Sequence, residues 1–177
     1  MLFRKLDRQA EYRASLDSLL RETGGTPPTK HDAASDHARI GELAYRATSE
    51  LLSAEGLSWQ ALTADEKAQV LVYSLVLCDA WSQLLKQPQE PAFFITCMHL
   101  SLLLFQPNSD KNIEASALVN VLLRQRAVVA AERLHATLPT FTPSLGSLAM
   151  ALVTDPGGRE RTLKALHSGF RVVLAHA

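Results

Sequence analysis

The sequence has little glycine, and the distribution of that glycine is the first guide to the fold. Eight of the 177 residues are glycine, and none lies between Leu57 and Leu145. Glycine and proline interrupt regular structure most often, so long helices can form here, broken only at prolines. No segment alternates apolar and polar residues between turn signals, as a half-buried strand would. The sequence therefore predicts an all-α protein, a single-domain bundle of six or seven helices around apolar central helices over residues 1–177.

Net charge is also absent, because 18 basic residues balance 18 acidic ones. A nucleic-acid-binding domain usually carries a basic surplus, so we expect no nucleic acid among the partners. The N-terminus is highly charged, and no apolar signal segment follows it. Residues 91–105 form an apolar run of about 15 residues, against roughly 20 for a membrane-spanning helix. We therefore expect a cytoplasmic protein with no membrane partner.

Cysteine is scarce as well, since only Cys78 and Cys97 occur, each inside an apolar segment. A chain of this length buries enough surface to fold without a disulfide or a structural metal. Thiols stay reduced in the cytosol. We therefore expect two buried free thiols, with a disulfide between them as the alternative.

Apolar periodicity and turn residues divide the chain into helices. Thr63 and Glu66 have the spacing of a capping box, which marks a helix start. Residues 92–105 are apolar on nearly all sides, so we expect this helix, including Leu103, to be central. The predicted helices cover residues 2–22, 33–54, 64–86, 92–105, 110–137, 144–153 and 159–175.

Specific catalytic motifs are missing. The sequence contains no Gly-x-Ser-x-Gly, Cys-x-x-Cys or His-Glu-x-x-His. Glu132 and His135 form one Glu-x-x-His unit, whereas a di-iron bundle needs two. The turn at 155–159 lacks the glycine and lysine spacing of a nucleotide-binding loop. These absences make a non-enzymatic protein more probable than an enzyme, and we expect no cofactor and no metal.

One cluster keeps a metal-dependent hydrolase open as an alternative. His31, Asp32, Asp36 and His37 lie near the start of one predicted helix. Histidine and aspartate together can ligate a catalytic metal. Acidic residues at a helix N-terminus are also explained by the helix dipole alone, and we favour that explanation.

A second alternative is a pocket for a small apolar ligand between the central helices. Cys97 and His99 lie two residues apart in the apolar 92–105 segment and are the candidate ligand-binding residues. Ordinary core packing is the competing explanation, because cysteine usually behaves as a small buried hydrophobe.

A third candidate is a contact surface on the 64–86 helix. Asp65, Gln69, Asp79, Gln83 and Lys86 fall on one stripe of this helix, and Val72 and Val76 interrupt it. The valines are either covered by another part of the chain or form a contact patch with Asp79. A patch of this kind would suit an isologous homodimer, since one surface then serves both copies.

These observations favour a non-enzymatic protein–protein interaction module, such as an adaptor, an inhibitor or an accessory factor. Its expected partner is another protein or a second copy of itself. The small-ligand binder and the metal-dependent hydrolase are the alternatives.

Overall fold

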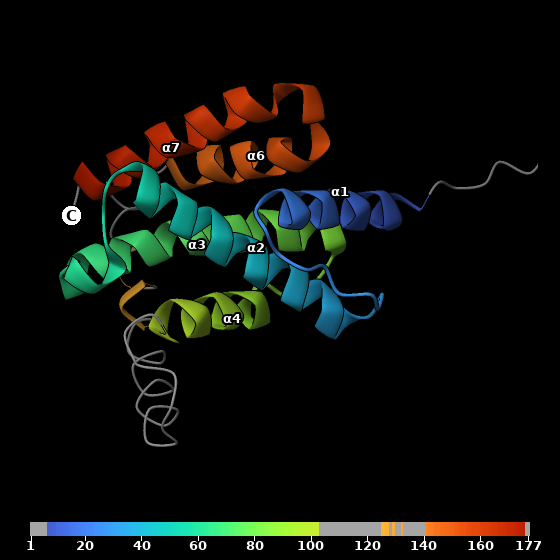
Figure 1. Ribbon diagram of the computed structural model, residues 1–177, viewed down its shortest axis with the longest axis horizontal. Coiled ribbons are helices and arrows are strands. Elements are labelled where there is room, and N and C mark those ends of the chain that lie inside the picture. The colour runs from blue at the N-terminus through green and yellow to red at the C-terminus, as the bar shows by residue number, and fades with distance from the viewer. Residues whose placement is uncertain (1–6, 103–124, 128, 130–131, 133–140, 176–177) are drawn as a thin grey trace, which may run out of the picture.

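The computed structural model describes residues 7–102, 125–127, 129, 132 and 141–175 (Figure 1). Six α-helices and two short 3-10 turns have defined bounds, residues 125–127, 129 and 132 are also helical, and no strand occurs among the described residues, which confirms the all-α prediction. The helices and turns are α1 (Arg8–Glu22), α2 (Ala33–Ala54), η1 (Trp59–Ala61), α3 (Ala64–Leu85), α4 (Gln89–Leu102), α6 (Phe141–Thr154), η2 (Pro156–Gly158) and α7 (Arg159–Ala175).

Local capping signals account for two helix starts that the sequence predicted. The side chain of Asp32 accepts a hydrogen bond from the backbone N–H of Ser35 at 2.8 Å, and α2 begins at the next residue. Thr63 and Glu66 form both hydrogen bonds of a capping box ahead of α3. These side chains satisfy backbone donors that have no acceptor inside the helix. The predicted bounds of α2 are confirmed, and α3 ends one residue earlier than predicted.

Two other helices begin earlier than predicted, and each has a proline in its first turn. Pro91 and Pro143 are the third residues of α4 and α6, whereas the sequence analysis placed both prolines before their helices. The backbone N–H groups of a first helical turn have no intrahelical acceptor. A proline costs no hydrogen bond there, so the predicted starts at residues 92 and 144 are too late.

Helix α3 occupies the centre of the described helices. It contacts α1, α2, α4, α6 and α7, and Figure 1 shows the α6–α7 hairpin on one side of it and α4 on the other. By length and composition α3 is apolar enough to cross a membrane, but 78% of its apolar window is buried within the protein. A central position explains this burial without a membrane.

Helix α4 packs against α2 and α3 among the described helices, and Phe94 on it is 39% exposed. This segment was expected from its sequence to be central. Its buried side consists of Ala92, Phe93, Thr96, Cys97 and Leu100. Leu103, which was expected to be central, lies outside the described residues.

A close contact joins α2 to α4. A Cβ atom at Gly41 would lie 2.7 Å from Cβ of Ile95, so only glycine lets the two backbones approach this closely. The hydroxyl of Thr96 donates to the backbone carbonyl of Gly41 at 3.0 Å. This hydroxyl lies 3.6 Å from the sulfur of Cys78. Both cysteines are buried and neither forms a disulfide, as predicted, and burial raises the pKa of the Cys78 thiol to about 12.

Two hydrogen bonds bring α1, α3 and α6 together. The Gln9 side chain, near the start of α1, donates to the carbonyl of Leu85 at the end of α3, at 3.3 Å. The Trp81 indole N–H donates to the carbonyl of Ala149 in α6 at 2.7 Å. These contacts fix the region where the three helices meet.

Candidate functional site

A buried charge cluster connects α1 to α2. Asp36 and Arg39, both on α2, are fully buried. Arg13 makes a two-pronged contact with Asp36, at 2.8 and 2.9 Å. Arg39 donates through Nε to Asp17 at 2.7 Å, and its Nη1 lies 3.5 Å from Asp36. Two cations therefore face two anions, and each buried charge has a partner, as burial requires.

The same cluster holds the loop that joins α1 to α2. Arg39 donates to the backbone carbonyl of Pro28 at 2.7 Å and to that of Lys30 at 3.0 Å. Carbonyls of a loop need such donors when they lie away from water. The guanidinium of Arg39 thus has partners on α1, α2 and the loop. The cluster therefore stabilises the packing of these three segments.

The four candidate metal ligands are not arranged as a metal site. The carboxylate of Asp36 is paired with the two arginines of the buried charge cluster. Asp32 caps α2, and hydrogen bonds from Ser35 lower its pKa. His31 is exposed and His37 is half-buried. Across the part of the chain that the structure describes, no group of three or more His, Cys, Asp or Glu side chains is placed to hold a metal ion.

Sequence analysis missed the arginines of the cluster. Arg39 lies beside Ile40 on the buried side of α2, and Asp36 lies three residues before it. An oppositely charged pair at this spacing shares one face of a helix. A charged pair within an apolar stripe was therefore the available signal, but it could not reveal Arg13 or Asp17 on the other helix.

The two candidate ligand-binding residues lie in different surroundings. Cys97 is fully buried in the core. The side chain of His99 is 28% exposed, and its Nδ1 lies 3.1 Å from a carboxylate oxygen of Glu42. The ring of Tyr45 meets His99 edge-on. Residues two apart on a helix point to different sides, so the structure does not bring Cys97 and His99 to one pocket.

The proposed contact patch on α3 is corrected by the structure. Val72 is 0% exposed and Val76 is 5% exposed, so the chain itself covers both valines. Asp79 is exposed and accepts a hydrogen bond from Gln83. Of the two explanations for these valines, coverage by another part of the chain is therefore the one that their burial supports. The helical wheel grouped the residues correctly but could not show which neighbours cover them.

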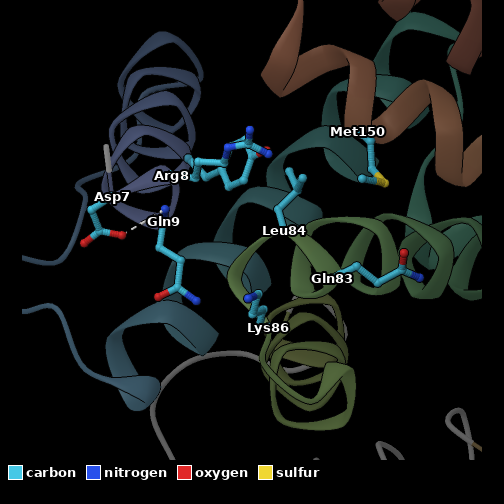
Figure 2. Close-up of a pocket in the computed structure, with 8 residues that line it drawn as sticks. Asp7, Arg8, Gln9, Gln83, Leu84, Lys86 and Met150 are labelled. Carbon is cyan, nitrogen blue, oxygen red and sulfur yellow. Dashed lines mark hydrogen bonds between the residues drawn. The ribbon is translucent and has the colours of Figure 1, made fainter. Parts of the chain in front are cut away.

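A surface hollow formed by described residues lies where α1, α3 and α6 meet (Figure 2). We call it the seam hollow, and its volume is about 940 Å³. Its lining residues are Asp7, Arg8, Gln9, Tyr12, Gln83, Leu84, Lys86 and Met150. In Figure 2 the Arg8 side chain extends from α1 toward Leu84, and Met150 projects from α6 over α3. Segments that are distant in sequence thus build one depression.

The second hollow is about 450 Å³ in volume and lies between the starts of α2 and α4. Its lining residues are Ala34, His37, Glu90, Pro91, Phe94 and Ile95. It is half as large and holds one carboxylate. The seam hollow combines apolar side chains with both signs of charge, which makes it the stronger candidate for recognition.

Two cations of the seam hollow are available to a ligand. Arg8 and Lys86 are both exposed. Within the described residues neither side chain forms an ion pair. Asp7, the one carboxylate among the described lining residues, accepts from the backbone N–H of Gln9 at 3.2 Å and caps α1. The hollow therefore presents unpaired positive charge beside an apolar floor.

Lys86 also has an unusual backbone conformation. Its φ is 54°, and it is the one non-glycine residue with positive φ among those described. Glycine is the usual residue in this left-handed conformation at a helix end. The left-handed conformation costs an L-residue roughly 1–2 kcal/mol. Lysine occupies this position although glycine would relieve the strain, and such strain often accompanies a functional position.

Replacing Lys86 by glycine would remove this backbone strain. Lys86→Gly is expected to raise the free energy of unfolding by about 1 kcal/mol, because the strain disappears and the exposed side chain has no ion pair to lose. Urea denaturation followed by circular dichroism measures the change. Lys67→Gly, inside α3, is the control and should destabilise the protein by at least about 1 kcal/mol, because glycine is unfavourable within a helix and the contact of Nζ with the Trp59 ring is also lost. A destabilised Lys86→Gly would show that the lysine side chain stabilises the fold.

No protein-family model matches the chain, and neither the curated proteins nor the solved structures include a significantly similar one. The function is therefore argued from the site alone.

Proposed function

We propose that this chain is a non-enzymatic interaction module, of the adaptor, inhibitor or accessory-factor type, that binds a segment of another protein in the seam hollow. The observation that carries the proposal is the pairing of an apolar floor with unpaired charge. Leu84 is 7% exposed, and Met150 and Tyr12 are half-buried around it. Arg8 and Lys86 lie on the same lining. Apolar anchors surrounded by polar groups are typical of protein interfaces.

The chemistry of the lining favours binding over catalysis. Among the described residues that form it there is no histidine, cysteine, serine or threonine. A lysine or tyrosine can also act as a nucleophile, but it needs activation by burial or by an adjacent base, and Lys86 is exposed. Gln9 and Gln83 contribute amide groups, which hydrogen-bond a ligand without reacting. Met150 has an unbranched, adaptable side chain, which is common at surfaces that accept peptides.

The size of the hollow suits the anchor of a larger contact. At about 940 Å³ it lies near the upper end of the range for ligand sites, roughly 300–1,000 Å³. A stable interface buries about 800 Å² on each partner, which is more than a depression of this size provides. We therefore propose that a short segment of the partner occupies the hollow and that neighbouring surface completes the contact.

The two alternative functions have less support. The hydrolase needs a metal site at His31, Asp32, Asp36 and His37, yet Asp36 is paired with two arginines. The small-ligand binder needs Cys97 and His99 in one pocket, yet one lies in the core and the other near the surface.

Selection of a random peptide library on the immobilised protein tests the proposal. Recovered peptides are then titrated individually by fluorescence anisotropy. Gln83→Trp places a large side chain at the hollow, and it is expected to weaken binding at least about tenfold, roughly 1.4 kcal/mol. Glu50→Trp, at an exposed site on α2, is the control and should bind normally. The proposal fails if the library yields no binding peptide, or if binding is the same with and without Gln83→Trp.

A further inference from the structure

We infer that the seam hollow selects acidic segments, in which an apolar side chain lies between aspartate or glutamate residues. This inference rests on the proposed function and adds the chemistry of the partner. It derives from the charges of the lining, which are Arg8, Lys86 and Asp7.

The two cations come from different helices. Arg8 is the first residue of α1, and Lys86 follows the last residue of α3. Asp7 already accepts a hydrogen bond at the start of α1, so it competes weakly with an incoming carboxylate. Among the described residues, the lining therefore has one more positive than negative charge, and a bound anion can meet a cation at either of two places.

Helix dipoles do not change the sign of the ligand charge that the seam hollow favours. The N-terminal end of α1 adds partial positive charge, and the C-terminal end of α3 adds partial negative charge. The Gln9 amide already satisfies the carbonyl of Leu85 at that end. Because the two helix ends oppose each other, the side chains decide which ligand charge is favoured.

The apolar floor determines the remaining part of the sequence pattern that we expect in the partner segment. Leu84 and Met150 form it together with Tyr12. An apolar side chain of the partner that covers this floor places its flanking residues near the rim, where the cations are. A neutral apolar segment would cover the floor but leave both cations without a partner. Complementary charge thus supplies specificity more than total affinity.

The test uses three short fluorescent peptides with the same central leucine and phenylalanine. Their flanking residues are aspartate and glutamate, asparagine and glutamine, or lysine. The proteins are the wild type and two double variants with the same change in net charge. Arg8→Glu with Lys86→Glu alters the seam hollow. Arg21→Glu with Lys164→Glu alters exposed sites elsewhere on α1 and α7.

The wild type is expected to bind the acidic peptide about tenfold more tightly than the neutral one, with the difference shrinking as salt rises. Arg8→Glu with Lys86→Glu should reverse the preference toward the lysine peptide, and the control pair should not. Lys86→Gly should weaken acidic-peptide binding a few-fold without unfolding the protein. Circular dichroism and urea denaturation check that each variant is folded.

Two results would overturn the inference. One is equal affinity of the wild type for all three peptides. The other is an unchanged preference in Arg8→Glu with Lys86→Glu. Neither contradicts the proposed function if library peptides still bind and Gln83→Trp still weakens them. If the three designed peptides fail while library peptides without acidic enrichment bind, the acidic preference is wrong and the interaction module stands.

Discussion

Asp36→Ala is expected to lower the free energy of unfolding by about 3–5 kcal/mol, the usual cost of removing one partner from a buried ion pair. Asp36 is fully buried and faces Arg13 and Arg39. Without it, the fully buried guanidinium of Arg39 retains a single carboxylate partner, Asp17. The remaining positive charge has too few anions in a region that water does not reach.

Urea denaturation of Asp36→Ala measures the loss. Asp79→Ala is the matched control, because Asp79 is exposed and its side chain accepts a hydrogen bond from Gln83. Its cost should stay within about 0.5 kcal/mol, as for most surface substitutions. A loss below about 1 kcal/mol for Asp36→Ala would mean that the arginines do not depend on this carboxylate.

Trp81→Ala is expected to cost about 3–5 kcal/mol, the range for a large buried aromatic residue. Trp81 is fully buried in α3. Its indole N–H donates to the carbonyl of Ala149, 68 residues away in α6. The substitution removes this hydrogen bond and opens a cavity beside the α6–α7 hairpin. Amide hydrogen exchange should then be faster in α6 than in α2.

Trp81→Phe separates the contribution of the indole hydrogen bond to stability from that of the buried ring. It retains much of the ring but removes the indole N–H that donates to the carbonyl of Ala149, which costs about 0.5–1.5 kcal/mol, because this carbonyl also lies within helix α6. If Trp81→Ala left α6 as protected as in the wild type, the indole would not be what holds α6 against α3. The result also bears on the seam hollow, because Met150, which lines it, follows Ala149 in α6. Trp81→Ala should therefore weaken peptide binding as well as lower the free energy of unfolding.

Local sequence was sufficient to predict where several helices begin. Asp32 and the Thr63–Glu66 capping box mark the starts of α2 and α3, since each cap uses atoms within three residues of the helix start. Such interactions depend on the neighbouring backbone and on no distant segment. Proline was a weaker guide, because Pro91 fits within the first turn of α4 as readily as before it.

The pairing of charges and the burial of side chains became visible only in the tertiary structure. The sequence shows that Val72 and Val76 interrupt a polar stripe, but only the packed neighbours of α3 bury them. The sequence places Asp36 near a helix start, where the helix dipole alone would explain it. The structure shows instead that Arg13, from the preceding helix, pairs with it.

The sequence by itself determined the helical fold, the caps and the two buried thiols, since helix periodicity and capping act over a few residues. The seam hollow was decided only by the tertiary structure. Arg8, Lys86 and Met150 come from α1, the end of α3 and α6, and no local pattern links them. They meet because Gln9 joins α1 to Leu85 and Trp81 joins α3 to Ala149. Contacts across such distances in sequence depend on how the helices pack, which periodicity does not specify.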